Sequence, residues 1–170
     1  MTAKRAGVWV AVDPGSVRIG VAACDPDQVL ASPVATLTST ESVSGVVGIV
    51  AERQAVGVIV GLPISLSGGE GSSARSARSY ALELATALAV PVYLVDERLT
   101  SVAAGAALRA GGHTAKSARR VVDQAAAAAL LQGVLDARVA GGHQCGDVLG
   151  GGLGERVVPD GVALERGGQS

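Results

Sequence analysis

Three acidic residues, far apart in the sequence, have the chemistry and the surroundings that a metal-assisted reaction needs. Asp13 follows a valine-rich run and precedes a Pro-Gly turn. Glu97 follows a second valine-rich run, and Asp123 lies in a long alanine-rich segment. If the fold brings the three together, their hard oxygen atoms predict a site for Mg²⁺ or Mn²⁺, with two ions expected.

Each acid taken alone also has a structural explanation. Asp13 could belong to an ordinary β-turn, and Glu97 could favour the positive end of a following helix. Asp123 could form salt bridges one or two helical turns away, with Lys116, Arg119 or Arg120. Only the joint placement of the three carboxylates favours a reaction centre.

The elements that must position these acids follow from hydrophobic periodicity. Strands are expected at residues 6–12, 18–24, 28–37, 56–62 and 91–95. Helices are expected at residues 40–54, 74–88, 101–110 and 116–139. A three-strand antiparallel start followed by β-α units predicts the α/β class, with a mixed five-stranded sheet flanked by helices.

Length and composition indicate one domain followed by a tail. Residues 1–139 can bury one sizeable core, whereas residues 140–170 are rich in glycine, have no sustained period and are expected to be disordered. The Gly/Ser-rich loop at 63–73 does not match a phosphate-binding loop and is either a flap near the acids or a simple linker.

The formal net charge is −1, so the protein as a whole is not basic and its net charge gives no support for nucleic-acid binding. Locally, residues 98–122 carry no acid and hold several basic side chains, namely Arg98, Arg109, Lys116, Arg119 and Arg120, with His113 among them. This segment is a candidate phosphate-facing surface, and the alternative is a solvated helix face. The absence of phenylalanine argues against a reader of single-stranded bases.

The composition indicates neither a membrane protein nor a small domain held together by disulfides. No apolar run is long enough to cross a bilayer, so a cytoplasmic location and no membrane partner are expected. Cys24 and Cys145 lack the spacing of a zinc site and are expected to be ordinary thiols, with a disulfide, within the chain or between chains, as the lesser alternative.

Four segments together resemble a known family. They are residues 12–22 (VDPGSVRIGVA), 60–63 (VGLP), 96–101 (DERLTS) and 122–127 (VDQAAA), in this order and at suitable spacing. Across residues 6–132 the chain is similar to the YqgF/RuvX family, which is related to the RuvC-type Holliday junction resolvases. Any one of these motifs alone would be a weak signal.

The resemblance implies a ribonuclease H-like fold and a cytoplasmic nuclease that processes the 5′ end of precursor 16S ribosomal RNA in ribosome biogenesis. Resolution of DNA four-way junctions is the competing assignment. It also implies that Asp13, Glu97 and Asp123 are the catalytic and metal-binding residues. Arg18 and Arg98 match arginines of the family's motifs and join the expected nucleic-acid-binding set, completed by Lys116, Arg119 and Arg120.

Two other classes of function remain open at this point. A strand followed by Asp-Pro-Gly and a hairpin also resembles the nucleotide site of actin-like and sugar-kinase ATPases, although those need two such domains. A nucleic-acid-binding module without catalysis would keep the fold and lose the acids. The expected partner is structured RNA or branched DNA, and resolution of a two-fold symmetric junction would require a homodimer.

Overall fold

The structure is a computed structural model, and it describes residues 6–15, 17–64, 69–99, 115–141, 146 and 149–159. Six strands form the sheet: β1 (Trp9–Pro14), β2 (Arg18–Cys24), β3 (Ala31–Thr38), β4 (Gly57–Leu62), β5 (Val92–Asp96) and β6 (Glu155–Val157). The helices are α1 (Ser42–Arg53), α2 (Ser72–Ala87) and α4 (Ala115–Gly141), with two short turns, η1 (Glu97–Leu99) and η2 (Leu149–Leu153).

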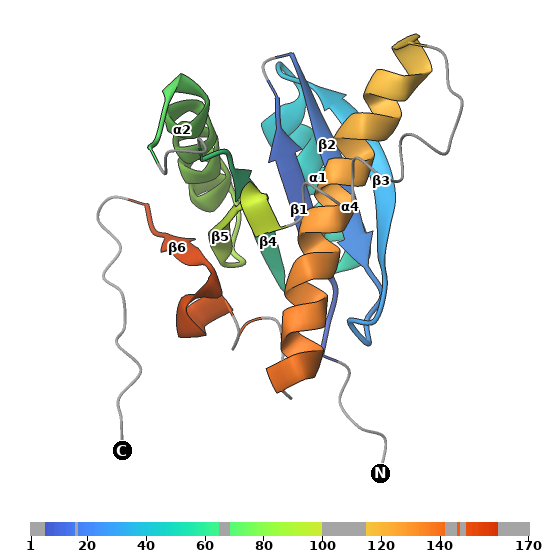
Figure 1. The fold of residues 1–170 in the computed structure, drawn as a ribbon, viewed down its shortest axis with the longest axis vertical. Helices are drawn as coiled ribbons and strands as arrows, with labels where there is room; N and C mark the ends of the chain where they lie inside the picture. The colour runs from blue at the N-terminus through green and yellow to red at the C-terminus, as the bar shows by residue number, and fades with distance from the viewer. Residues whose placement is uncertain are drawn as a thin grey trace.

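The sheet is mixed, with strand order β3-β2-β1-β4-β5-β6 (Figure 1). The first three strands form an antiparallel meander, and β1, β4 and β5 run parallel. Strand β4 lies between β1 and β5, and all six of its residues are buried, as expected for a strand covered on both faces. The α/β class and the mixed sheet flanked by helices are therefore confirmed.

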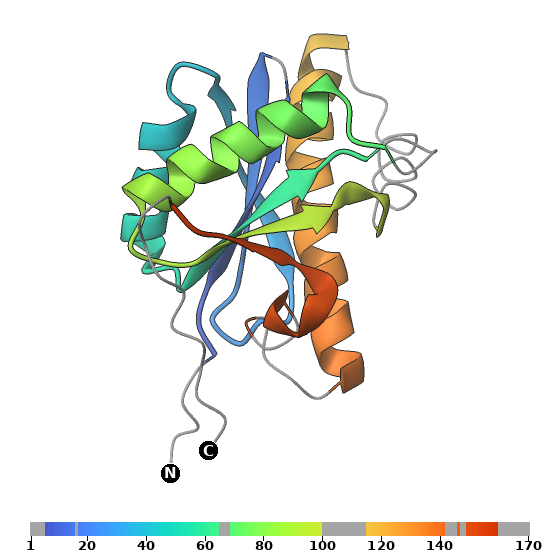
Figure 2. The same ribbon diagram turned by 90° about the vertical axis from the view of Figure 1, so that its left-hand side faces the viewer.

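Helices cover the two faces of the sheet separately (Figures 1 and 2). In β1, Val10 and Val12 belong to the core shared with α1 and α2, whereas Trp9 and Ala11 belong to the core shared with α4. This alternation is the period-two pattern of a strand buried on both faces. Asp13 continues the series of Trp9 and Ala11, so it belongs to the α4 side of the sheet.

Small residues set the position of α4 against the sheet. Its alanine-rich part packs over β1, β2 and β3. Farther along, Gln132 anchors the helix to the β2–β3 connection: its Oε1 accepts the N–H of Ala31 at 2.9 Å, and its Nε2 donates to the carbonyl of Val29 at 3.2 Å. Among the described residues, no helix is both long and apolar enough to cross a membrane.

The C-terminal part of the chain differs from the sequence-based expectation. A sixth strand, β6, pairs antiparallel with β5, so the five-stranded count was wrong. The expectation of disorder was also wrong for residues 149–157, because Leu149 is fully buried among Trp9, Tyr93 and α4, and a three-residue strand follows it. One buried leucine and an open sheet edge order this short segment despite its glycine content. The expected helix at 101–110 and Cys145 lie outside the described residues.

Candidate active site

The centre of the site is Asp13, which stands between two glycines on the neighbouring strands. In the antiparallel pair, Asp13 is opposite Gly20 of β2. On the other side, Val12 pairs with Val60 of β4, so Gly61 is the next residue along that strand. Since neither neighbour carries a side chain, the sheet surface beside Asp13 is open on both sides. Other carboxylates can enter that space.

Glu97 enters from the β4 side. Strand β5 ends at Asp96, and η1 begins with Glu97. The side chain of Glu97 lies over Gly61: a Cβ at that glycine would stand 2.7 Å from Glu97 Oε1 and 3.0 Å from its Cγ. Beyond Gly61, the carboxylate of Glu97 hydrogen-bonds to that of Asp13. The missing side chain at position 61 therefore lets these two acids meet.

The neighbouring acid, Asp96, is held elsewhere. Arg98 donates from Nη2 to Asp96 Oδ2 at 2.6 Å and from Nε to the same oxygen at 2.9 Å. These hydrogen bonds keep the pKa of Asp96 below its ordinary value. Of the two consecutive acids, Glu97 is thus the one that faces Asp13.

Asp123 enters from the β2 side. Helix α4 crosses β2 so closely that a Cβ at Gly20 would overlap the backbone carbonyl of Asp123. Arg18, at the start of β2, places its Nε 3.6 Å from Asp123 Oδ2, which is an ion pair but longer than a hydrogen bond. That Oδ2 atom is buried and has no hydrogen-bond partner among the described residues. A buried carboxylate oxygen in this state is costly, and its surroundings fit the binding of a cation.

Burial and mutual repulsion perturb the protonation of these acids. Burial, together with the hydrogen bond and the charge of Glu97, raises the pKa of Asp13 to about 8. Burial also raises the pKa of Asp123, where the Arg18 charge lowers it and the Asp13 charge adds to the increase. Asp13 therefore interacts with Glu97 and raises the pKa of Asp123, and without a cation Asp13 keeps a proton near neutral pH.

This raised pKa predicts an unusual dependence of stability on pH. In metal-free protein, folded Asp13 holds its proton up to about pH 8, while the unfolded chain loses it near 3.8. The contribution of protonated Asp13 to the stability of the fold is fully present below the unfolded pKa of 3.8. It is lost as pH rises toward the folded pKa of about 8. The free energy of unfolding should fall by up to about 1.4 kcal/mol per pH unit across this window. Urea unfolding in EDTA at several pH values, with Asp13→Asn as the comparison, measures the effect; equal slopes for the two proteins would refute it.

The donor set fits a divalent metal ion. Three carboxylates are hard oxygen ligands of the kind that Mg²⁺ and Mn²⁺ prefer, and a cation would offset the burial and the repulsion that together raise the pKa of Asp13. Within the described part of the chain, no three acidic, histidine or cysteine side chains stand close enough together to enclose an ion. The structure pairs Asp13 with Glu97 and holds Asp123 at longer range beside Arg18.

The expected phosphate-binding residues divide into three groups. Arg18 lies at the site, in contact with Asp123. Arg98 is half-exposed beside the site, but its guanidinium is engaged by Asp96, so a phosphate would have to compete for it. The remaining three belong to α4, and their side chains lie outside the described part of the structure: Lys116, Arg119 and Arg120.

The two glycines that leave room for the acids were not predicted from the sequence. Gly20 follows Arg18 and Ile19 in an otherwise apolar strand, and Gly61 lies in a strand of branched apolar residues that begins with Gly57; a glycine inside such a strand signals a close approach. The signal was present, but it does not say what approaches. Only the packing of α4 and the path of Glu97 supply that information.

Replacing Gly61 by alanine is expected to lower metal-dependent activity about 10- to 100-fold while leaving stability nearly unchanged. The new Cβ would push the carboxylate of Glu97 away, which a flexible side chain can accommodate. Steady-state kinetics and urea unfolding separate the two effects. Gly48→Ala, where a Cβ meets nothing within 4 Å, is the matched control and should keep full activity. Full activity in Gly61→Ala would show that the position of Glu97 does not matter.

Comparison with known proteins identifies relatives of this chain. Residues 7–137 match the model of a family described as "RuvX: Holliday junction resolvase". A protein of Kineococcus radiotolerans is 50% identical over 89% of this chain and 83% of its own length, and one of Thermobifida fusca is 52% identical over 78% and 89%. Both carry the name "Putative pre-16S rRNA nuclease".

Among solved structures, the fold is similar to that of RuvC from Thermus thermophilus in complex with a Holliday junction substrate. The TM-score is 0.53 at 15% identity, over 79% of this chain and 96% of that one. This likeness confirms the ribonuclease H-like fold that the motifs implied. With the family model spanning most of the sequence and relatives half identical to it, the chain belongs to the RuvX family.

Proposed function

We propose that this protein is a metal-dependent nuclease that hydrolyses phosphodiester bonds, with Asp13, Glu97 and Asp123 as its catalytic residues. The observation that carries the proposal is the pairing of Asp13 with Glu97 over Gly61, with Asp123 at longer range on the other side of Asp13. Asp13 shares a hydrogen bond with Glu97, and Asp123 presents a buried oxygen without a hydrogen-bond partner among the described residues. Structural roles alone, as turn or salt-bridge residues, do not explain a carboxylate whose pKa is raised to about 8.

Each residue has a distinct part in this proposal. Asp13, Glu97 and Asp123 are the residues that would hold the two divalent ions. When bound, Mg²⁺ or Mn²⁺ would supply an activated water molecule and neutralise charge on the leaving oxygen. Arg18 lies next to Asp123 and would hold a substrate phosphate there. Lys116, Arg119 and Arg120 would add contacts to the backbone of the nucleic acid, which orient the substrate without reading its sequence.

The natural substrate that we propose is precursor 16S ribosomal RNA, cut at its 5′ end, with the protein acting in the cytoplasm. The names of the relatives that are half identical to this chain support it. A four-way DNA junction is the second candidate, supported by the description of the family. The triad would perform the same hydrolysis on either, because such chemistry acts on the phosphodiester and not on the base.

The test offers both substrates to the purified protein in parallel. Precursor 16S ribosomal RNA and a four-way DNA junction are each incubated with Mg²⁺, with Mn²⁺ or with EDTA. We expect metal-dependent cleavage of the RNA near its 5′ end and no cleavage in EDTA. Symmetrical cutting of the junction, by a protein that sediments as a dimer, would instead assign the second function. Metal-independent cleavage, or none of either substrate, would refute the nuclease proposal.

A further inference from the structure

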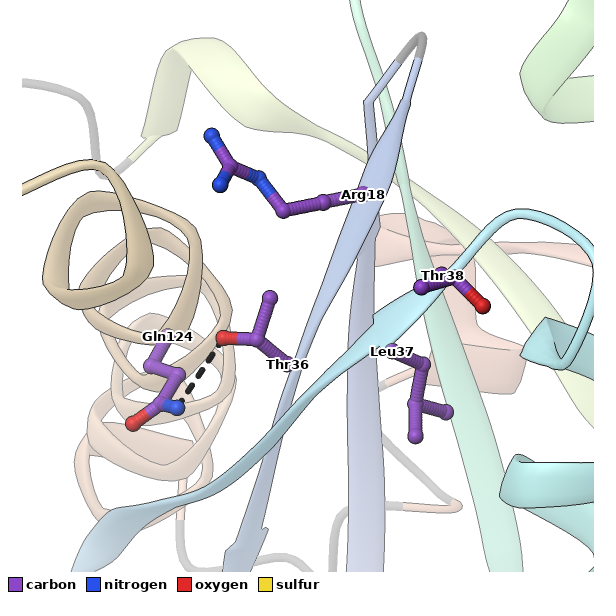
Figure 3. A pocket seen from close by; sticks show the side chains of 5 residues that line it. All are labelled: Arg18, Thr36, Leu37, Thr38 and Gln124. Carbon is purple, nitrogen blue, oxygen red and sulfur yellow. Dashed lines mark hydrogen bonds between the residues drawn. The ribbon is translucent and has the colours of Figure 1, made fainter. Parts of the chain in front are cut away.

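A hollow of about 220 Å³ lies beside Asp123, between strands β2 and β3 and helix α4. Arg18, Thr36 and Gln124 face one another across it (Figure 3). Leu37 and Thr38 line its edge on β3, with side chains that turn away from Arg18. Gln124 directly follows Asp123 in α4, so the hollow adjoins the proposed catalytic centre.

The lining of this hollow offers hydrogen-bond donors and positive charge. The guanidinium of Arg18 extends from β2 toward α4 (Figure 3). Gln124 donates from Nε2 to Thr36 Oγ1 at 3.0 Å, which uses one of the two N–H groups of that amide. Among the described residues, no carboxylate lines the hollow itself, and the nearest acid to its guanidinium is Asp123, 3.6 Å from Arg18 Nε. A guanidinium beside an oriented amide suits a phosphate group, with which arginine forms paired hydrogen bonds.

We propose that this hollow binds a phosphate of the substrate strand next to the phosphate that is cleaved. Arg18 and Gln124 are its ligands, and Thr36 is a positioning residue that orients the amide of Gln124. The proposal rests on the nuclease function proposed above and adds the path of the substrate: the strand runs from the three acids over β2 toward the β3 edge of the sheet. Arg18, within 3.6 Å of Asp123, then links the two phosphate positions.

The hydrogen bond between Gln124 and Thr36 also has a purely structural interpretation, because it ties α4 to β3. Removal of both polar groups by Thr36→Val with Gln124→Leu keeps the shape and deletes the two partners of this hydrogen bond together, so stability should change little. Gln124→Glu keeps the shape as well and introduces a negative charge into the hollow. A structural role predicts unchanged binding of nucleic acid by these folded variants, whereas a phosphate site predicts weaker binding.

The experiment measures binding of a labelled precursor 16S ribosomal RNA fragment over a range of salt concentrations. All variants carry Asp13→Asn, so that the RNA is not cut. Arg18→Gln should reduce the slope of log K against log salt by about 0.7 to 0.9, the loss of one phosphate contact. Thr36→Val with Gln124→Leu should weaken binding about tenfold at unchanged slope, and Gln124→Glu should weaken it further.

Matched controls lie on the opposite face of the sheet. Arg53→Gln in α1 removes the same charge, and Thr86→Val in α2 removes the same hydroxyl; both should leave affinity and slope unchanged. Equal slopes for Arg18→Gln and Arg53→Gln, or full affinity in the Thr36 and Gln124 variants, would overturn the phosphate site while the nuclease proposal stands. Absence of RNA binding by the Asp13→Asn parent, with no cleavage by the wild type, would overturn both.

Discussion

Replacing Gly20 by alanine is expected to destabilise the protein by about 3 kcal/mol or more, at the upper end of the cost of overpacking a core. The added Cβ would overlap the backbone carbonyl of Asp123 and stand 2.9 Å from the backbone nitrogen of Gln124. A side chain could rotate away, but the backbone of a helix can yield only if α4 moves as a whole. Since the total stability of a domain is typically 5 to 15 kcal/mol, such a loss is large.

Urea unfolding of Gly20→Ala and Gly48→Ala provides the measurement. Gly48 lies in α1 where a Cβ meets nothing within 4 Å, so alanine there should raise stability by up to about 1 kcal/mol through helix propensity. The folded fraction of Gly20→Ala should also lose nuclease activity, because a shifted α4 carries Asp123 away from Asp13. Wild-type stability in Gly20→Ala would show that α4 does not approach β2 as described.

Replacing Asp13 by asparagine is expected to reduce metal-dependent cleavage by roughly 10³-fold or more, as for other groups that act as a unit at a reaction centre. Asparagine preserves the shape but cannot carry the negative charge that would bind a cation. The fold should persist, because Asp13 already carries a proton near neutral pH in the absence of metal. At pH 8 in EDTA, Asp13→Asn should be at least as stable as the wild type, since it avoids a buried charge.

The control for this loss is a carboxylate outside the site. Asp136 lies on the exposed part of α4 and accepts a hydrogen bond from Gln132, and Asp136→Asn should cleave at the wild-type rate. Glu97→Gln and Asp123→Asn should resemble Asp13→Asn. Cleavage by any of these three at the rate of Asp136→Asn would remove that residue from the proposed triad.

The sequence predicted most of the sheet and the placement of the acids. Valine-rich runs that end in Asp13 and Asp96-Glu97 were correctly assigned to strands, and the polar groups do emerge where those strands end. The charge of Asp123 beside an apolar helix face correctly indicated a partly buried group that needs a partner, which is Arg18 in the structure. Local periodicity suffices for these features because each depends on the few residues around it.

What the sequence did not predict depends on contacts between distant segments. Arg18 was expected to bind phosphate, but nothing in its neighbourhood indicates that it lies beside Asp123, more than a hundred residues away. The same holds for the bond between Thr36 and Gln124 and for β6, whose three residues become a strand only because β5 offers an open edge. Periodicity over three residues carries too little signal to be recognised.

The proposed nuclease mechanism requires that the three carboxylates form one metal site. Calorimetric titration of Mn²⁺ into metal-free protein near pH 7 measures this directly, with the wild type, Asp13→Asn and Asp136→Asn compared in two buffers of different ionisation enthalpy. We predict that the wild type and Asp136→Asn bind Mn²⁺ and release a proton as Asp13 ionises. Asp13→Asn should bind Mn²⁺ weakly and release no proton. Equal Mn²⁺ binding and proton release by Asp13→Asn and the wild type would contradict this prediction.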